Sequence, residues 1–545
     1  MAHDSSHGFH GPRCWVISLL VGVILGLVVA AIAPARYTDH HTAQAPEASL
    51  ASRDAHAQGT PLPPGEALAN GHETFDPLDP APTRLPAGAI PQAAYAAADH
   101  SADDHHDEHG PTPVIPLWLV VPFAVMLISI ALMPFINMRI WHHHFPDFAF
   151  FLGGGILAYY LSAFNLPYAH GLSYGQYQMS HIALEYYAFI ALVGGLYVAS
   201  GGILVDIRGR GRPALNTAIL GIGAVMANIV GTTGASVLLI RPFMRINKGR
   251  LKPIHVVFFI FIVSNCGGGL TLIGDPPLYL GFLKGVPAEW TIFNLFNQWL
   301  TVNAMLLGIF YVIDTRIPVA SLDLDHVGPT RVRVRGASGL IALPLIVAGV
   351  FIDPMLRGTA LEGKPVGATF QIAVAMLAYA MADRSILRLN EFTFFPVKEV
   401  GLLFVGIFVT MAPALAYLSE HGAELGIDSA SKYFFATGLL SGFLDNAPTY
   451  LNFLQVAFAA EGLELKPAQM HTFLGSVRGT HALAAISTGA VFFGAMTYIG
   501  NGPNFMVKSI AEAGGLKMPS FFGYIKYALV FLLPVLVIVW ATSIL

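Results

Sequence analysis

The sequence predicts an all-α polytopic membrane protein made of two inverted-topology repeats, each with a re-entrant helical hairpin and a broken transmembrane helix. Of its 545 residues, 54% are hydrophobic and only 11% are charged, whereas about 25% are charged in an ordinary soluble domain. Apolar runs near the bilayer-spanning length of about 20 residues recur along most of the chain. This composition excludes an ordinary soluble enzyme, and nothing in it indicates nucleic-acid binding.

A motif that occurs once in each half is the second observation. Residues 271–280 read Thr-Leu-Ile-Gly-Asp-Pro-Pro-Leu-Tyr-Leu, and residues 497–506 read Thr-Tyr-Ile-Gly-Asn-Gly-Pro-Asn-Phe-Met. Both lie inside long apolar segments. A plain transmembrane helix is expected to contain neither an Asp nor a pair of prolines there. Broken apolar segments at corresponding places in two halves indicate the binding site of a secondary transporter.

Residues 1–35 are predicted to be an N-terminal signal anchor or signal peptide. The 19 residues from Trp15 to Ala33 form an apolar run, and the small residues Ala33-Pro34-Ala35 after it suit a signal peptidase. The length of the run favours the uncut anchor. Cys14 and Cys266 lie in or beside separate predicted spans, so we expect no structural disulfide.

Residues 36–112 are predicted to be a disordered, acidic, His-rich linker on the extracytoplasmic side. The segment is rich in Ala, Pro, His, Asp and Glu and has no apolar period, so it cannot bury enough surface to fold. His105, His106 and His109 stand among acids that would let them chelate Zn or Ni loosely. A solvated linker is the favoured interpretation, and a metal sensor or buffer that feeds a transporter is an alternative.

The first repeat is predicted at 113–313, with spans at 114–138, 148–165 and 182–204. The apolar segment 214–240 has basic loops on both flanks, which places both of its ends in the cytoplasm. Its 27 residues are too few for two crossings of about 20 residues each, so we predict a re-entrant hairpin with its tip at 231–234. Segment 254–284 then crosses outward with a break, and 292–313 crosses back.

The second repeat is predicted at 338–545, after a basic cytoplasmic linker at 314–337. Its spans are expected at 338–352, 366–382 and 399–418. A second hairpin at 431–460 enters from the acidic outer side, and a broken helix at 480–510 and a last span at 521–543 follow. Because the first repeat begins outside and the second begins inside, the two have inverted topology, which is the arrangement used for alternating access.

The breaks depend on prolines and glycines. Proline cannot donate a backbone hydrogen bond and its ring clashes with the preceding turn, whereas glycine lets the backbone leave helical geometry. The freed backbone groups need partners, which an ion or a polar substrate can supply. The predicted helix-break residues are Gly274, Pro276, Pro277, Gly500 and Pro503.

Asp275 in the first break and Asp445 at the second hairpin tip are the main candidate ion-binding residues. A charge near the bilayer centre costs roughly 2.5–3.5 kcal/mol on insertion scales, so it marks a functional candidate. A buried carboxylate can exchange a proton for a cation. The alternative is that each Asp only caps the helix that follows it.

Short polar side chains gather at the two predicted hairpin tips and the two predicted breaks. They suit oxygen coordination of an ion or a substrate. Any one of them alone can be an interhelical hydrogen bond worth about 0.6 kcal/mol, so their clustering is the signal. For Glu185 and His481 we favour a structural role, and Arg478 is a candidate for charge balance or proton relay. The candidate site residues besides the two aspartates are Asn228, Thr232, Thr233, Ser264, Asn265, Asn446, Thr449, Asn501 and Asn504.

The segments Ser264-Asn-Cys-Gly-Gly-Gly and Ile273-Gly-Asp-Pro-Pro resemble the signature of the ion transporter superfamily. Within it, the chain looks most like sodium:proton antiporters of the NhaD kind, citrate carriers and arsenite permeases. The resemblance covers roughly 113–543. It implies two inverted repeats that work by an elevator motion, as a homodimer.

The hairpin tips depart from one branch of that superfamily. Sodium-coupled dicarboxylate carriers have Ser-Asn-Thr at each tip, whereas the corresponding residues here are Gly231-Thr-Thr and Asp445-Asn-Ala. We therefore predict a Na⁺/H⁺ antiporter of a bacterial-type cytoplasmic (inner) membrane, with no cofactor and with Na⁺ and H⁺ as the transported ions. A cation-coupled carrier of citrate or a related carboxylate is the alternative. An intramembrane aspartyl protease is a distant one, because residues 272–275 lack Gly-x-Gly-Asp.

Overall fold

The computed structural model describes residues 12–33, 35–37, 110–318 and 331–545. The predicted linker, with His105, His106 and His109, lies almost wholly outside the described residues. In the described part, nearly all regular structure is helical. Seven of its helices are long and apolar enough to cross a membrane, which confirms the all-α polytopic membrane class. They are Leu117–Pro134, Tyr174–Gly201, Pro213–Ile246, Ala288–Thr315, Phe395–Leu425, Val477–Met496 and Phe521–Ser543.

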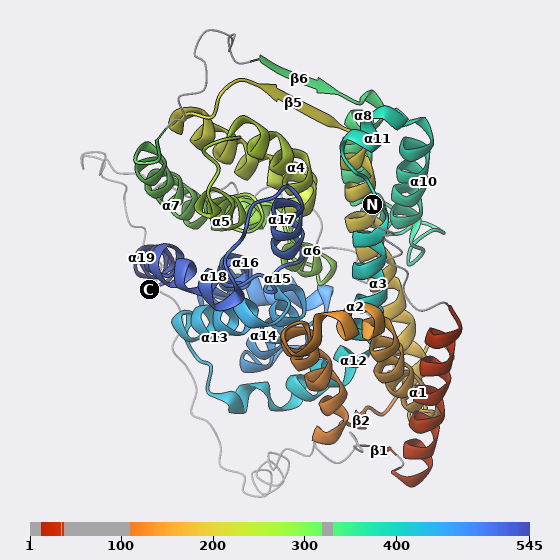
Figure 1. Cartoon of the computed structure of the whole chain (residues 1–545). Helices are drawn as coiled ribbons and strands as arrows, with labels where there is room; N and C mark the ends of the chain where they lie inside the picture. The colour runs from red at the N-terminus through yellow and green to blue at the C-terminus, as the bar shows by residue number, and fades with distance from the viewer. Residues whose placement is uncertain (1–11, 34, 38–109, 319–330) are drawn as a thin grey trace, which may run out of the picture.

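The helices gather into two bodies, which lie side by side in Figure 1. We call the first the three-span body. It takes its name from the three spans that open each half of the chain, and it contains those of both halves. Helix α12 packs on α2 and α3, and α10 packs on α3 and α8. Its helices are α1 (Pro12–Ile32), η3 (Leu117–Val120), α2 (Val121–Ala163), α3 (Tyr174–Gly201), α8 (Ala337–Gly349), α9 (Ile352–Met355), α10 (Val366–Met381), α11 (Arg384–Leu389), α12 (Phe395–His421) and η6 (Gly422–Leu425).

Helix α2 is two antiparallel arms and not one long rod. Asn137 has non-helical backbone angles (φ −155°, ψ 91°) inside it. The rings of Trp118 and Tyr159 are 5.4 Å apart, although 41 residues of straight helix would separate them by about 60 Å. The two arms match the spans predicted at 114–138 and 148–165.

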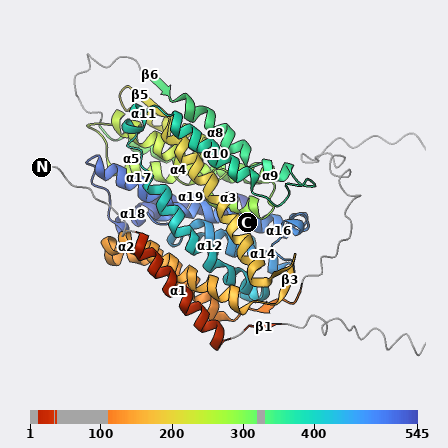
Figure 2. The ribbon, with the colours of Figure 1, turned by 90° about the vertical axis from the view of Figure 1, so that its right-hand side faces the viewer.

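Helix α1 lies against the second arm of α2, as Figure 2 shows. The approach is close because glycines face each other: a Cβ at Gly26 would clash with the carbonyl of Gly155, and one at Gly154 would lie 2.9 Å from Leu19 Cδ1. The Tyr159 hydroxyl also donates to the Ala33 carbonyl at 2.9 Å. The apolar run at the N-terminus is therefore packed as part of the three-span body.

Short antiparallel strand pairs join loops of this body. The pair β5–β6 connects the two basic segments that the sequence analysis places in the cytoplasm, with Asp206 opposite Arg333. These strands were not predicted, because the alternation Arg-Val-Arg-Val-Arg is exposed along its length and indicates a strand only once its partner is known. The strands are β1 (Arg36–Tyr37), β2 (Pro113–Val114), β3 (Pro167–Ala169), β4 (Leu172–Ser173), β5 (Leu204–Arg208) and β6 (Arg331–Arg335).

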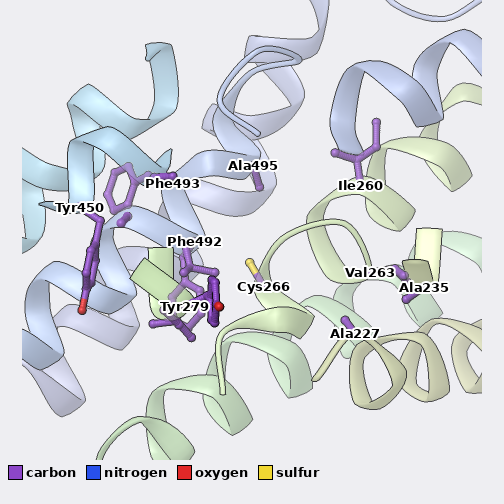
Figure 3. Close-up of a cluster of buried hydrophobic side chains, with 14 of the residues drawn as sticks. Ala227, Ala235, Ile260, Val263, Cys266, Tyr279, Tyr450, Phe492, Phe493 and Ala495 are labelled. Carbon is purple, nitrogen blue, oxygen red and sulfur yellow. The ribbon is translucent and has the colours of Figure 1, made fainter. Parts of the chain in front are cut away.

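We call the second body the hairpin body. It combines the hairpin, the broken helix and the last span of each half. A core of buried aromatic and aliphatic side chains fills it, and Figure 3 shows Tyr279, Tyr450 and Phe492 from three of its helices gathered there. Its elements are α4 (Pro213–Ile246), α5 (Pro253–Ile262), η4 (Cys266–Gly268), α6 (Pro276–Leu283), α7 (Ala288–Thr315), α13 (Ala430–Phe443), α14 (Asn446–Ala460), α15 (Pro467–Gly475), α16 (Val477–Phe493), η7 (Gly494–Met496), α17 (Gly502–Ala513), α18 (Phe521–Tyr527), the π-helical turn η8 (Ala528–Leu532) and α19 (Leu533–Ser543).

Helix α4 doubles back at Gly231, as the sequence predicts. Asn216 Nδ2 donates to Asn247 Oδ1 at 2.8 Å, whereas 31 residues of straight helix would span about 46 Å. Gly231 has φ 75° and ψ 157°, a conformation that side-chain-bearing residues rarely adopt. The arms are longer than predicted, since α4 ends at Ile246 and includes Arg241 and Arg245, which the sequence analysis assigned to a loop.

The second hairpin consists of α13 and α14, joined through the extended residues Leu444 and Asp445. The arms have 14 and 15 residues. Each is therefore about 21–23 Å long, which is shorter than the hydrocarbon core of about 30 Å. Neither arm can cross a bilayer alone, as expected for a segment predicted to enter and return.

Candidate functional site

The two helix breaks have nearly the same backbone. Asp275 (φ −142°, ψ 146°) precedes α6, and Asn501 (φ −153°, ψ 140°) precedes α17. Pro276 and Pro277 occupy the first turn of α6, and Pro503 occupies the first turn of α17. Proline is tolerated there because the first helical N–H groups have no partner within the helix. Each break is thus the start of a new half-helix.

Glycines let each break fold closely on itself. A Cβ at Gly274 would lie 2.1 Å from the carbonyl oxygen of Gly268, and a Cβ at Gly500 would lie 2.6 Å from that of Gly494. Both distances are too short for any side chain. The predicted break residues Gly274 and Gly500 therefore serve close approach of the backbone, at matching places in the two halves.

Each hairpin tip is hydrogen-bonded to the break of its own half. In the first half, Thr271 Oγ1 donates to the Asn228 carbonyl at 2.7 Å, and Thr232 N donates to the Gly274 carbonyl at 2.8 Å. In the second half, Thr497 Oγ1 donates to the Gly442 carbonyl at 2.6 Å. Thr271 and Thr497 are the first residues of the repeated motif, so the same side chain makes the same contact twice.

The carboxylate of Asp275 lies where these four elements meet, and the side chain is 1% exposed. Its Oδ1 accepts from Thr232 Oγ1 at 2.7 Å and from Asn501 Nδ2 at 2.9 Å. Its Oδ2 accepts from Asn446 Nδ2 at 2.5 Å. The three donors come from the first hairpin tip, the second break and the second hairpin tip. We call these four residues the Asp275 cluster.

The two candidate carboxylates have different roles in the local structure. Asp275 makes no side-chain hydrogen bond to the first turn of α6, although it occupies the capping position. Asp445 does cap α14, because its Oδ1 accepts from Ala447 N at 3.0 Å. Asp445 therefore caps the helix that follows it, and Asp275 does not. The buried carboxylate of Asp275 instead accepts hydrogen bonds from its three side-chain donors.

Asn265 and Asn504 form a second layer between the two halves. Asn265 Nδ2 donates to Asn504 Oδ1 at 2.6 Å, and Asn504 Nδ2 donates to the Gly494 carbonyl at 2.8 Å. In the described part of the chain, the buried Asn265 Oδ1 has no hydrogen-bond partner. It lies 3.2 Å from the point that a Cβ on Gly494 would occupy, and Asn446 Nδ2, which donates to Asp275, lies 3.6 Å from that point. A buried oxygen without a donor is suited to a hard cation.

The other predicted site residues lie nearby without reaching the carboxylate. Asn228 bonds to the backbone of the first break, with Oδ1 accepting from Leu270 N at 3.1 Å. The Ser264 side chain pairs with Ser236, while its carbonyl accepts from Asn501 Nδ2 at 3.3 Å. Thr449 Oγ1 donates to the Asp445 carbonyl at 2.8 Å. Thr233 is partly buried, and in the described part of the chain its side chain makes no hydrogen bond to Asp275.

Three charged residues that the sequence places near membrane depth lie outside the Asp275 cluster. Glu185 pairs with Lys284 at 2.5 Å, and Arg478 Nε is 3.4 Å from Glu461 Oε1. His481 is exposed. The structural role favoured for Glu185 and His481 agrees with these positions, and the placement of Arg478 does not support charge balance at Asp275.

Sequence reasoning missed a buried polar cluster around Asp314. Asp314 accepts from Arg250 Nη2 at 2.6 Å and from Asn216 Nδ2 at 2.7 Å, and its Oδ1 is 2.9 Å from His255 Nε2. None of these four residues is more than 5% exposed. They tie the start of α4 to α5 and α7, and so hold the first hairpin in place. An Asp at the end of an apolar run was the available signal.

Comparison with known proteins adds one match. A family model described as "Putative citrate transport" matches residues 112–544. The match begins just before β2 and covers both hairpins, both breaks and the whole Asp275 cluster. No curated protein matches the chain.

Proposed function

The chain belongs to this citrate transport family, and on that premise we propose that it carries citrate or a related carboxylate together with a cation. The match covers 112–544, far more than half of the chain, so the protein is a secondary transporter. The family supports the carboxylate alternative better than Na⁺/H⁺ antiport, which was the first prediction from sequence. It also supports transport over the intramembrane protease.

The coupling cation is proposed to bind at Asp275. The carboxylate supplies the charge, and the unpartnered Asn265 Oδ1 supplies a second buried oxygen. Hard cations such as Na⁺ take oxygen ligands of this kind. In the described conformation the three donors of the Asp275 cluster hold the carboxylate at the point where the two breaks and the two hairpin tips meet.

The carboxylate substrate is proposed to bind at the start of α17. The first N–H groups of a half-helix favour an anion. Asn501 carries no charge there, Gly502 is exposed, and nothing lies within 4 Å of the position of a Cβ on Gly502. The start of α6 is unsuitable, because the charge of Asp275 would repel an anion.

Coupling follows from this arrangement. Two like unit charges about 4 Å apart repel by about 4 kcal/mol at an effective dielectric constant of 20. A polyanion near Asp275 therefore binds well only when a cation neutralises the carboxylate. We propose that transport proceeds by alternating access of two inverted repeats in the cytoplasmic membrane, as a homodimer. The matching hydrogen bonds of the two halves support the repeat.

Na⁺/H⁺ antiport remains a second candidate because of one observation. The carboxylate of Asp275 is buried among donors, and Asp445 stands at the residue before its partner Asn446. A site with this carboxylate can bind either a cation or a proton.

Uptake of labelled citrate into proteoliposomes tests the proposal directly. We expect citrate to accumulate against its gradient when Na⁺ or H⁺ is supplied on one side, and to stop accumulating when that gradient is collapsed. Dye-monitored, Na⁺-driven proton movement without any citrate dependence, together with no citrate uptake, would replace the carboxylate proposal by the antiport one.

A further inference from the structure

The two bodies meet along α3 and α4, along α12 and α14, and where α6 faces α3. Among the residues that the structure describes, three ion pairs join the two bodies. Lys284 at the end of α6 pairs with Glu185 of α3. The other two join the second arm of α4 to loops of the three-span body, and they are Arg241–Glu391 and Arg245–Asp206.

The Glu185–Lys284 pair is the most sheltered of the three. Its side chains are 22% and 16% exposed, whereas Glu391 is 73% exposed and Arg245 is 52% exposed. Exposed pairs contribute little because water and salt screen them. Lys284 Nζ donates a charge-assisted hydrogen bond to Glu185 Oε1.

Lys284 sits on the half-helix that begins at Asp275. It is the C-terminal cap of α6, about 13 Å along the helix from Asp275. A Cβ at Gly281 would clash with the Tyr450 hydroxyl, so α6 packs tightly on α14 and belongs to the hairpin body. The Tyr279 hydroxyl reaches across to the Ala188 carbonyl of α3 at 3.3 Å. Through Tyr279 and Lys284, the helix that begins after Asp275 is therefore bonded to α3 of the three-span body.

We propose that the Glu185–Lys284 ion pair is a releasable latch between the hairpin body and the three-span body. It stabilises the described conformation and opens when the bodies move. The inference rests on the alternating access proposed above, because only relative motion of the two bodies requires the pair to separate.

Distance measurement between spin labels tests the latch without any substrate. Labels are placed on Ala360→Cys in the three-span body and on Ala468→Cys in α15. Both residues are exposed. Ala468 follows Pro467, whose Cα lies 2.8 Å from the point that a Cβ on Gly285 would occupy, and Ala360 lies in the loop after α9. Cys14 is replaced by Ser, and Cys266 is fully buried.

We expect Glu185→Gln to raise the population of a second, longer distance about tenfold, because a hydrogen bond between charged groups is lost. The exchange Glu185→Lys with Lys284→Glu should return the distribution to that of the parent. Lys432→Gln is the matched control, since it removes an ion pair with Asp428 that joins only residues at the start of α13. A distribution that Glu185→Gln leaves unchanged would overturn the latch.

A reversible cross-link between Glu185→Cys and Lys284→Cys, made with a short bis-methanethiosulfonate reagent, gives the second measurement. Cross-linked protein should lose citrate uptake, and a reductant should restore it. Uptake by the cross-linked protein at the rate of the reduced protein would also overturn the latch. If the parent protein takes up no citrate while Glu185→Gln still shifts the distances, the latch stands and the proposed function fails.

Discussion

The two helix breaks are alike in backbone and differ in the side chain that precedes each half-helix. Asp275 and Asn501 occupy the same position in the repeated motif, with φ and ψ within about 11° of each other. The amide of Asn501 donates to the carboxylate of Asp275 at 2.9 Å. Two Asp residues at this distance would share a proton, and two Asn residues would carry no charge. One of each gives a single negative charge with its own donor.

In the proposed function, this difference assigns the two ligands to different halves. The first break would supply the charge that a cation needs, and the second would present an uncharged half-helix start to an anion. Both hairpin tips contact the charged break, since Thr232 and Asn446 donate to Asp275, and Asp445 caps its own helix. A nearly symmetric backbone thus supports an asymmetric site.

Replacing the charge in the first break should have the largest effect. Asp275→Asn removes an attraction of about 4 kcal/mol between unit charges about 4 Å apart at an effective dielectric constant of 20, which is about a thousandfold in cation affinity. We expect cation-driven citrate uptake to be lost. The thermal stability of the purified protein should also fall, because a buried amide in place of the carboxylate cannot accept all three hydrogen bonds. If uptake by Asp275→Asn still follows the Na⁺ gradient, the coupling cation does not bind at the first break.

Adding a charge to the second break should affect the anion instead. Asn501→Asp is expected to raise the KM for citrate about a hundredfold at alkaline pH, because a second carboxylate repels the substrate. The Na⁺ concentration for half-maximal uptake should not rise. Uptake measured from pH 6 to 9 should fall more steeply than in the parent protein, since the two carboxylates share a proton at low pH. An unchanged KM for citrate would contradict the placement of the anion.

Much of this arrangement could be predicted from the sequence. The hairpins follow from apolar segments that are too short to cross twice, and the breaks follow from Gly274, Pro276 and Pro277. The site at Asp275 follows from a carboxylate that no transmembrane helix tolerates without a partner. These features are local, so composition and spacing are enough to find them.

The partners of these residues could not be predicted, because they depend on contacts between distant segments. Asn446 and Asn501 reach Asp275 from 171 and 226 residues away. The same reason hid the cluster of Asp314 with Arg250, whose charge the sequence shows only as part of a basic loop. It also hid the difference in capping between Asp275 and Asp445, since both have the residue type that caps helices.

The threonine at the first hairpin tip should matter less than the two breaks. Thr232→Val removes one donor to the carboxylate, and hydrogen bonds to charged groups contribute about 1.5–3 kcal/mol. We expect the Na⁺ concentration for half-maximal citrate uptake to rise about tenfold, with little change in the maximal rate at saturating Na⁺. A shift confined to the KM for citrate would mean that Thr232 serves the substrate and not the cation.

The threonine at the second tip is the matched control and should have the smallest effect. Thr449 Oγ1 donates to the backbone carbonyl of Asp445 and not to the carboxylate of Asp275. Thr449→Val therefore removes an ordinary hydrogen bond of a membrane helix, worth about 0.6 kcal/mol. We expect a small loss of thermal stability and a half-saturating Na⁺ concentration within about twofold of the parent value. A change as large as that of Thr232→Val would show that Thr449 also contributes to cation binding.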